Sequence, residues 1–275
     1  MIAAAPYREF MASPSDLYRL DDLIIDDEDA FASLPVYQAL KAVLVDDGYR
    51  FSVPAGVHGR WDRALVLNLT FWGGGSDVLP DPRISADVVT HVAWHHLAAR
   101  AFAAATGGPL SVDALFMGEA IASAFDLYLV GRLMARPAKA PPSSFLETQV
   151  PAMAETADAA GLSARKFEKL LQGIAADPDQ AFEDLRCLLF DVSTALVGCV
   201  AVHDGLAVLE RFGSHRFAPL LHRFELSNWV LWARAWAADR LAPDATVRAV
   251  DAAMRQAPSS IDWMTTTWLP GPVSA

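Results

Sequence analysis

The 275-residue chain has little positive charge and very little lysine. Its 22 basic residues stand against 33 acidic ones, which gives a net charge of −11. A protein that binds nucleic acid needs a basic face for the phosphates, so this composition argues against nucleic acid as a partner. The few lysines are Lys41, Lys139, Lys166 and Lys169.

Cysteine is equally scarce, and the chain lacks both a secretion signal and a long uncharged apolar run. Cys187 and Cys199 lie in an apolar helical stretch, which is typical of buried thiols in a reducing compartment. The first ten residues lack the basic and apolar regions of a signal peptide. The longest uncharged apolar run, residues 192–202, is shorter than the ~20 residues that span a bilayer. We therefore expect a soluble cytoplasmic protein with no membrane partner.

Apolar residues, by contrast, make up 53% of the chain, which is enough for a large buried core. Strand patterns occur only before residue 80, at residues 49–53 and 63–72, and helical periodicity dominates after that. The sequence predicts an α+β, mainly helical fold: a small N-terminal sheet region, then a helix hairpin, then a C-terminal helical bundle. Helices are expected near residues 30–45, 86–105, 112–135, 164–175, 180–212 and 224–241.

Two segments of unusual composition interrupt this pattern. Residues 13–29 are acidic and are expected to form a solvated lead into the first helix. Residues 137–151 are rich in proline and predict a linker or lid. This segment separates an α/β region, residues 1–136, from a helical region, residues 152–275. In the last predicted helix a tryptophan stripe is assigned to the core: Trp229, Trp232 and Trp236.

Two consecutive helices carry the polar pattern of greatest interest. Ser85 and Ser111 are placed to cap them, and the short connection makes them antiparallel neighbours. His91 and His95 are four residues apart on the first helix, so both imidazoles lie on one face. The second helix carries a polar stripe on one face: Glu119, Ser123 and Asp126.

Counting outward from the middle of the turn places the two polar faces in register. At 1.5 Å per residue, Glu119 lies ~4.5 Å along the axis from the level of His95, and Asp126 lies at the level of His91. A buried carboxylate needs a partner. The count therefore predicts that Glu119 contacts His95 and that Asp126 contacts His91, with or without a metal ion between them.

These two segments resemble the metal site of the gluzincins, a group of zincin metallopeptidases. In that family a helix carries the zinc-binding motif His-Glu-x-x-His, and a glutamate on a following helix supplies the third ligand. The positions that match here are His91, His95 and Glu119. The resemblance covers roughly residues 60–130 and implies zinc as the cofactor.

The resemblance also implies roles for the surrounding residues. Asp126 would accept a hydrogen bond from the free ring nitrogen of His91 and fix its orientation, with Ser123 beside it and Asp87 as an alternative. The predicted strand at residues 64–71 would lie beside the helix that bears the histidines and line the substrate site.

The sequence departs from the family at Val92, where gluzincins have their catalytic glutamate. That glutamate takes a proton from the zinc-bound water, and general-base catalysis is worth ~10²–10⁴-fold in rate. Valine cannot do this, so we expect a degenerate metallopeptidase with weak or no peptidase activity and a site for a peptide or small-molecule ligand. Another base would have to come from Asp87, His58 or His203.

Two other functions fit the same residues. Two histidines and one carboxylate also suit non-haem iron, as in an oxygenase or oxidase. A non-enzymatic binding or structural protein would use these side chains as a buried histidine–carboxylate hydrogen-bond network. His96 is expected to face elsewhere, the spacing assigns no role to His215 or His222, and the oligomeric state is not predicted.

Overall fold

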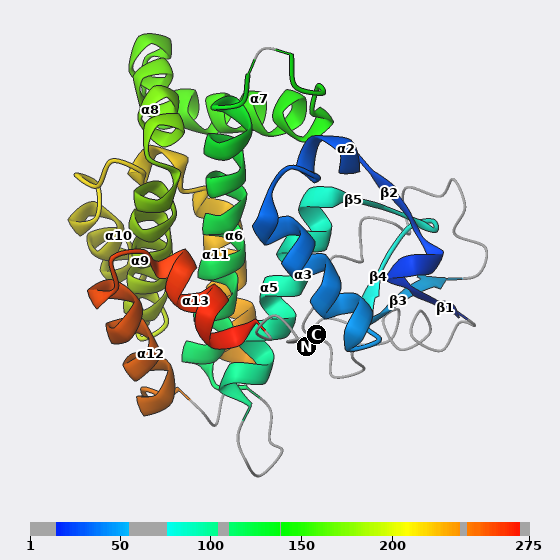
Figure 1. The fold of residues 1–275 in the computed structure, drawn as a ribbon. Coiled ribbons are helices and arrows are strands. Elements are labelled where there is room, and N and C mark those ends of the chain that lie inside the picture. Colours follow the sequence, from blue (N-terminus) through cyan, green and yellow to red (C-terminus); the bar gives the residue numbers. More distant parts are fainter. Residues whose placement is uncertain (1–14, 55–75, 104–109, 138, 237–240, 270–275) are drawn as a thin grey trace.

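The computed structural model describes residues 15–54, 76–103, 110–137, 139–236 and 241–269. These residues are mostly helical, with a small strand region at one side of the helical body (Figure 1). The predicted α+β, mainly helical class is confirmed at this level. The predicted strand at residues 64–71 and His58 lie outside the described residues.

Three short strands form the larger sheet, in the order β1-β3-β4. β1 pairs antiparallel with β3, and β3 pairs parallel with β4, so Phe51 lies between Tyr18 and Asp77. The strand predicted at residues 49–53 is confirmed as β3. The bounds are β1 (Ser15–Arg19), β3 (Arg50–Pro54) and β4 (Ser76–Val78).

A second, two-stranded sheet pairs β2 (Ile24–Asp26) in parallel with β5 (Arg83–Ser85). The prediction that strands occur only before residue 80 is therefore wrong. β5 is three residues long and runs directly into a helix, so it is too short to produce an alternating pattern.

The described part of the acidic segment, residues 15–29, is folded onto the body and is not a solvated lead. Leu20 begins a 3₁₀ turn, η1 (Leu20–Asp22), and is buried. Asp27 has a φ of 63°, and its carboxylate accepts hydrogen bonds from the Ser143 hydroxyl and the Phe145 N–H. An acidic side chain thus holds the start of a helix more than a hundred residues away, which a charge pattern does not reveal.

The first helices are α2 (Glu28–Phe31) and α3 (Pro35–Asp46), with Pro35 in the first turn as predicted. The predicted hairpin follows as α5 (Ala86–Phe102) and α6 (Val112–Met134). The Ser111 hydroxyl caps α6 by accepting from Ala114 N–H at 3.1 Å. Ser85 holds the corresponding position of α5 without a side-chain capping bond.

The remaining chain is helical, with three departures from prediction. Half of the predicted linker is helix, because the next helix begins at Ser144 and runs through Pro151. The helix expected at residues 180–212 is two helices, and two further helices follow the last one expected. The elements are α7 (Ser144–Ala159), α8 (Ala164–Ala176), α9 (Pro178–Leu196), α10 (Val202–Arg211), η2 (Ala218–Leu220), α11 (Arg223–Trp236), α12 (Ala245–Gln256) and α13 (Ser260–Trp268).

α6 is the central helix of the fold. It packs against α5 and α9 and also contacts α7, α8, α11 and α12 (Figure 1). Its length and composition would allow it to cross a membrane, yet 83% of its apolar window is buried inside the fold. We therefore identify it as a core helix. The predicted cytoplasmic location remains a prediction.

Gly131 allows α6 to approach the junction between α8 and α9. A Cβ atom at this position would lie 2.7 Å from the carbonyl oxygen of Ile174, closer than non-bonded atoms allow. Any larger residue would push the two segments apart. The close approach fixes α9 against the central helix.

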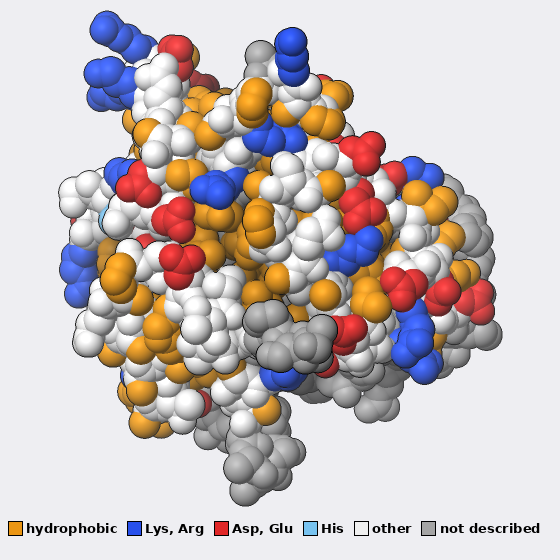
Figure 2. Space-filling view, in the orientation of Figure 1, with side chains coloured by type: hydrophobic (Ala, Val, Ile, Leu, Met, Phe, Trp, Pro, Cys, Tyr) orange, Lys and Arg blue, Asp and Glu red, His pale blue; other side chains and the backbone are white. Residues whose placement is uncertain are grey.

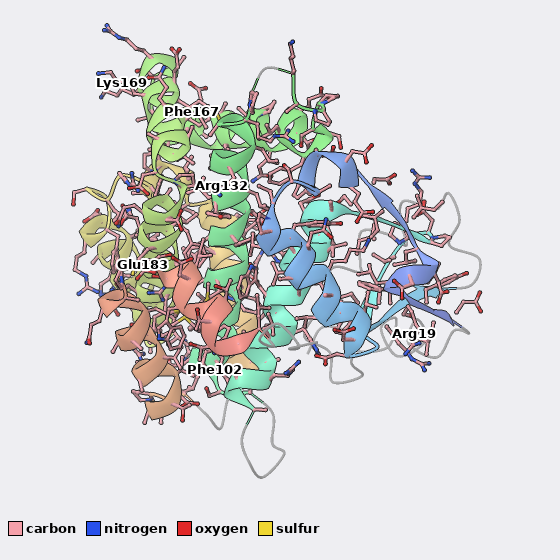
Figure 3. The ribbon with its side chains drawn as sticks, viewed as in Figure 1. Arg19, Phe102, Arg132, Phe167, Lys169 and Glu183 are labelled. Carbon is pink, nitrogen blue, oxygen red and sulfur yellow. The ribbon has the colours of Figure 1, made fainter. Side chains whose placement is uncertain are left out.

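Arg186 of α9 is fully buried and ties the C-terminal helices to the body. Two of its nitrogens donate to the Glu183 carboxylate, at 2.7 and 2.6 Å, and a third donates to Asp251 of α12 at 2.8 Å. The Ser260 hydroxyl of α13 also donates to Glu183, at 2.7 Å. Figure 3 labels Glu183 on α9.

Charged side chains of both signs are interspersed with apolar ones on the face seen in Figure 2. The tip of α8 projects from the body and carries basic side chains, among them Lys169, which Figure 3 labels. Both cysteines are free and half-buried: Cys187 and Cys199.

Candidate metal centre

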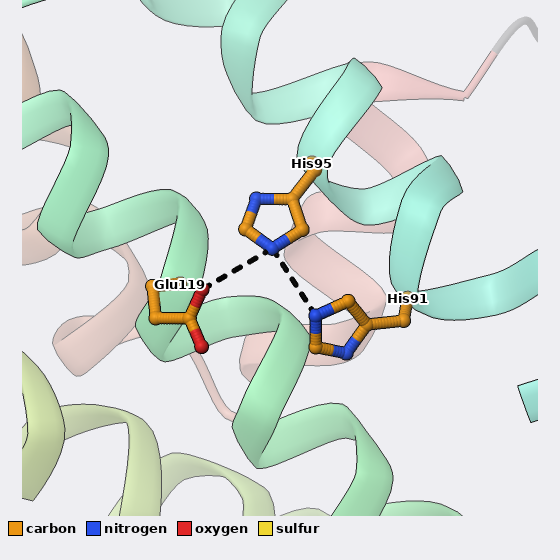
Figure 4. Close-up of side chains that lie close together, drawn as sticks. All are labelled: His91, His95 and Glu119. Carbon is orange, nitrogen blue, oxygen red and sulfur yellow. Dashed lines mark hydrogen bonds and ion pairs between the residues drawn. The ribbon is translucent and has the colours of Figure 1, made fainter. Parts of the chain in front are cut away.

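The two histidines of α5 face a glutamate of α6 across the hairpin (Figure 4). The Nε2 atoms of His91 and His95 lie 3.2 Å apart, and His95 Nε2 lies 3.4 Å from Glu119 Oε2. One ligand atom from each residue lies within 4.8 Å of the other two. We call these three residues the His–Glu cluster.

The spacing within the cluster matches that of atoms bound to one metal ion. Zinc–nitrogen and zinc–oxygen bonds of ~2.1 Å in a tetrahedron place neighbouring ligand atoms about 3.4 Å apart. Octahedral coordination with similar bond lengths would place them about 3.0 Å apart. The observed separations of 3.2 and 3.4 Å lie within this range, so they fit ligands of one metal ion but do not select its geometry.

Two further side chains of α6 hold the cluster in place. His91 Nδ1 lies 3.1 Å from Asp126 Oδ2, and the Ser123 hydroxyl donates to Glu119 Oε1 at 2.9 Å. The contacts predicted from the hairpin count are therefore present: Asp126 with His91, and Glu119 with His95. Such partners fix the orientation of metal-binding side chains.

The cluster is buried on one side and accessible on the other. The side chain of His95 is 6% exposed, whereas those of His91 and Glu119 are 28% and 31% exposed. His95 therefore anchors the group in the core, and the other two residues border solvent.

The electrostatics of the cluster couple its members. Burial disfavours a charged His91, but the Asp126 carboxylate and the nearby Glu119 outweigh it and raise the pKa of His91 to about 9. Burial likewise disfavours ionised Glu119, but its bond to His95 and the two histidine charges lower the pKa of Glu119 to about 2. Without metal, the cluster therefore holds a cationic imidazole and a carboxylate at neutral pH.

The same atoms also have a consistent metal-free arrangement. Because His91 Nδ1 faces a carboxylate, it carries a hydrogen and donates to Asp126. The two Nε2 atoms then face each other, and His95 Nε2 also faces Glu119 Oε2 at 3.4 Å, so these three atoms must share a proton. A metal ion at this point would take the place of that proton.

A cavity of about 660 Å³ borders the cluster. Glu119, Ser123 and Asp126 form part of its wall, and α7, α9, residues 220–222 and α11 form the rest. Trp229 and Trp232, predicted to be core residues, pack against the core but also line this cavity, with their rings stacked at a centroid distance of 5.0 Å. The side chain of Trp236 is outside the described part of the chain.

The residue at the family's base position faces the core. Val92 is 4% exposed and belongs to the hydrophobic core. Of the alternative bases, Asp87 lies one turn before His91, and burial raises its pKa, with a further contribution from the Asp126 charge. His203 is 85% exposed on α10 beside Asp204 and is not part of the cluster.

The other histidines are distributed over the fold. His96 faces away from the cluster, as predicted, and its Nε2 lies 2.7 Å from Asp47 Oδ2. His215 accepts a hydrogen bond from Phe217 N–H. His222 lines the cavity, and sequence reasoning missed it because it lies about a hundred residues from Glu119 with no spacing to connect them.

No protein-family model, curated protein or solved structure matches the chain. The resemblance to gluzincins therefore depends on the motif residues and the geometry of the cluster.

Proposed function

We propose that the protein binds one divalent transition-metal ion, zinc in the first place, through His91, His95 and Glu119. The observation that supports this best is the convergence of three ligand atoms from two helices within 4.8 Å. The partners of His91 and Glu119 on α6 add support, because they orient both side chains toward a common point. Zinc is proposed first because the three ligand residues match the gluzincin motif, and non-haem iron is the alternative.

On this proposal the protein is a zincin-like relative without ordinary peptidase chemistry. Zinc with an open coordination position supplies Lewis acidity and lowers the pKa of a bound water. The chain's own contribution would be to hold the ligands and to accept a proton. Val92, an apolar residue of the core, cannot accept one. Asp87 is the remaining base candidate among the described residues, since a carboxyl with a raised pKa is the stronger base.

The proposal is tested by metal analysis of untagged protein. Wild-type protein dialysed against zinc should retain about one equivalent, whereas His91→Ala, His95→Ala and Glu119→Gln should lose it. His96→Ala is the matched control, because this residue lies next to His95 in sequence but pairs with Asp47. It should retain the zinc.

The outcomes separate the three functions. Stoichiometric zinc that depends on the cluster supports the proposal, and iron with oxygen-dependent absorbance favours the oxygenase alternative. If wild-type protein retains no zinc, iron, cobalt or manganese, and the metal content of His96→Ala equals that of His95→Ala, the cluster is a hydrogen-bond network. Cobalt substitution gives a second reading, because its absorption spectrum distinguishes four from six ligands.

A further inference from the structure

The cavity beside α6 has the composition of a small-molecule site. Its volume of about 660 Å³ falls within the ~300–1,000 Å³ typical of ligand pockets. Aliphatic and aromatic side chains form most of its wall, with Phe116, Trp229 and Trp232 as the aromatic members. Met153 adds a flexible side chain, which adapts to ligands of different shape.

The lining of this cavity includes three carboxylates. Glu119 and Asp126 lie on the α6 wall, and Glu225 of α11 lies at the solvent side, where it is 78% exposed. None of the described residues that line the cavity is lysine or arginine. The His91 ring paired with Asp126 offsets part of this negative charge, and the carboxylates in excess would repel a ligand carboxylate or phosphate and attract a cation.

The α6 wall also offers a hydrogen-bond acceptor. Asp126 Oδ1 is buried and has no hydrogen-bond partner among the described residues, although Oδ2 of the same group pairs with His91. A buried carboxylate oxygen without a donor costs free energy. Because this oxygen is buried, a ligand N–H group in the cavity would reach it only if the Asp126 carboxylate turned toward the cavity that the residue lines.

The walls argue against an extended peptide as the occupant. The described walls are helices α6, α7, α9 and α11 with the turn at residues 220–222. Backbone groups within a helix are already hydrogen bonded to one another, so these walls offer no edge to which a peptide strand can add. Recognition here depends on side chains.

We propose that this cavity binds a small apolar amine. The apolar body would pack against Phe116 and the stacked indoles of Trp229 and Trp232, whose faces attract cations. The ammonium group would face the carboxylates of Glu119 and Asp126. The proposal goes beyond the metal centre and does not require the metal, although the two sites share Glu119.

The test is calorimetric titration of the full chain after metal removal with a chelator. The probes are 4-butylbenzylamine, 4-butylbenzyl alcohol and 4-butylbenzoate, which have the same body and differ in charge. The amine should bind one per chain and at least about tenfold more tightly than the carboxylate, with the alcohol between them. A carboxylate that binds as tightly as the amine, or no binding by any probe, would overturn the proposal.

Paired variants locate the site. Trp232→Ala should weaken amine binding at least about fivefold, whereas Leu231→Ala, a neighbouring residue that is 62% exposed, should not change it. Glu225→Gln, at an exposed position where a substitution does not threaten folding, should weaken binding of the amine and leave binding of the alcohol unchanged. Glu168→Gln on α8 is its control. Equal effects in each variant and its control would show that the amine binds elsewhere.

Metal binding is read separately on the same samples. Amine binding by chelated protein that never retains zinc would support the cavity and reject the metal centre. Zinc retention without amine binding would support the metal centre and reject the amine site in the cavity.

Discussion

His91 Nε2 lies 3.2 Å from His95 Nε2, and His91 Nδ1 lies 3.1 Å from an Asp126 oxygen. The His91 ring therefore bridges a carboxylate on α6 and the other histidine on α5. A ring held at both nitrogens has one orientation available to it. The following predictions depend on this arrangement.

Zinc binding should release a proton. Because His91 has a pKa of about 9 in the metal-free protein, it is protonated at neutral pH and must lose its proton to bind metal. We expect zinc affinity to rise about tenfold per pH unit between pH 6.5 and 8.5, with about one proton released. Calorimetry in buffers of different ionisation enthalpy measures the release, and a pH-independent affinity would contradict the role of His91.

The stability of the metal-free protein should depend on pH at both ends. The raised pKa of His91 contributes stability that is complete below its ordinary 6.5 and is lost as the pH rises through about 9. The lowered pKa of Glu119 contributes stability that is complete above its ordinary 4.5 and is lost as the pH falls through about 2. Urea unfolding across pH 3–9 should show the alkaline loss in wild type but not in His91→Gln.

Asp126→Asn should weaken zinc binding without abolishing it. Asparagine keeps the shape and an acceptor oxygen but removes the charge that stabilises His91, and loss of such a partner typically costs ~10–100-fold in metal affinity. Competition with a chelating dye measures the change. Asp113→Asn, at an acidic residue of the same helix that pairs with Arg248, is the control and should bind zinc as wild type does.

The wild-type protein should hydrolyse generic peptides weakly or not at all, with or without zinc. Val92→Glu introduces the family's residue, and Val92→Gln controls for size. Because Val92 is 4% exposed, we expect both variants to unfold at lower temperature than wild type. Brisk zinc-dependent proteolysis by the wild type would show that another residue, with Asp87 the first to test, acts as base.

Arg186→Met should strongly destabilise the fold. It would leave the carboxylates of Glu183 and Asp251 without their buried cation, and breaking a buried pair in this way costs ~3–5 kcal/mol. Arg83→Met, which removes an exposed partner of Asp26, should cause a far smaller loss. Denaturant unfolding monitored by circular dichroism distinguishes them.

The hairpin and its polar contacts were predictable because helix geometry is regular. A rise of 1.5 Å per residue and a short connection suffice to place Glu119 beside His95 and Asp126 beside His91. The same regularity gave the bounds of α5 and α6 to within a few residues.

Features that depend on tertiary packing were not predictable in this way. The cavity brings Glu119 together with His222 and Trp229, which only the packing of α11 against α6 places near it. Trp229 and Trp232 show the apolar spacing of core residues, and nothing in that spacing distinguishes a core from a cavity wall. The charge of Asp27 predicts a side chain in solvent, whereas its carboxylate oxygen accepts hydrogen bonds at the start of α7.

Glu119 contributes one side chain to both the His–Glu cluster and the cavity. Two ligands that contact the same carboxylate are thermodynamically linked. If the first ligand changes the affinity of the second by some factor, the second must change the affinity of the first by the same factor. The occupancy of the cavity would therefore set how much metal the protein holds at a given free concentration, and metal supply would set how readily the cavity fills.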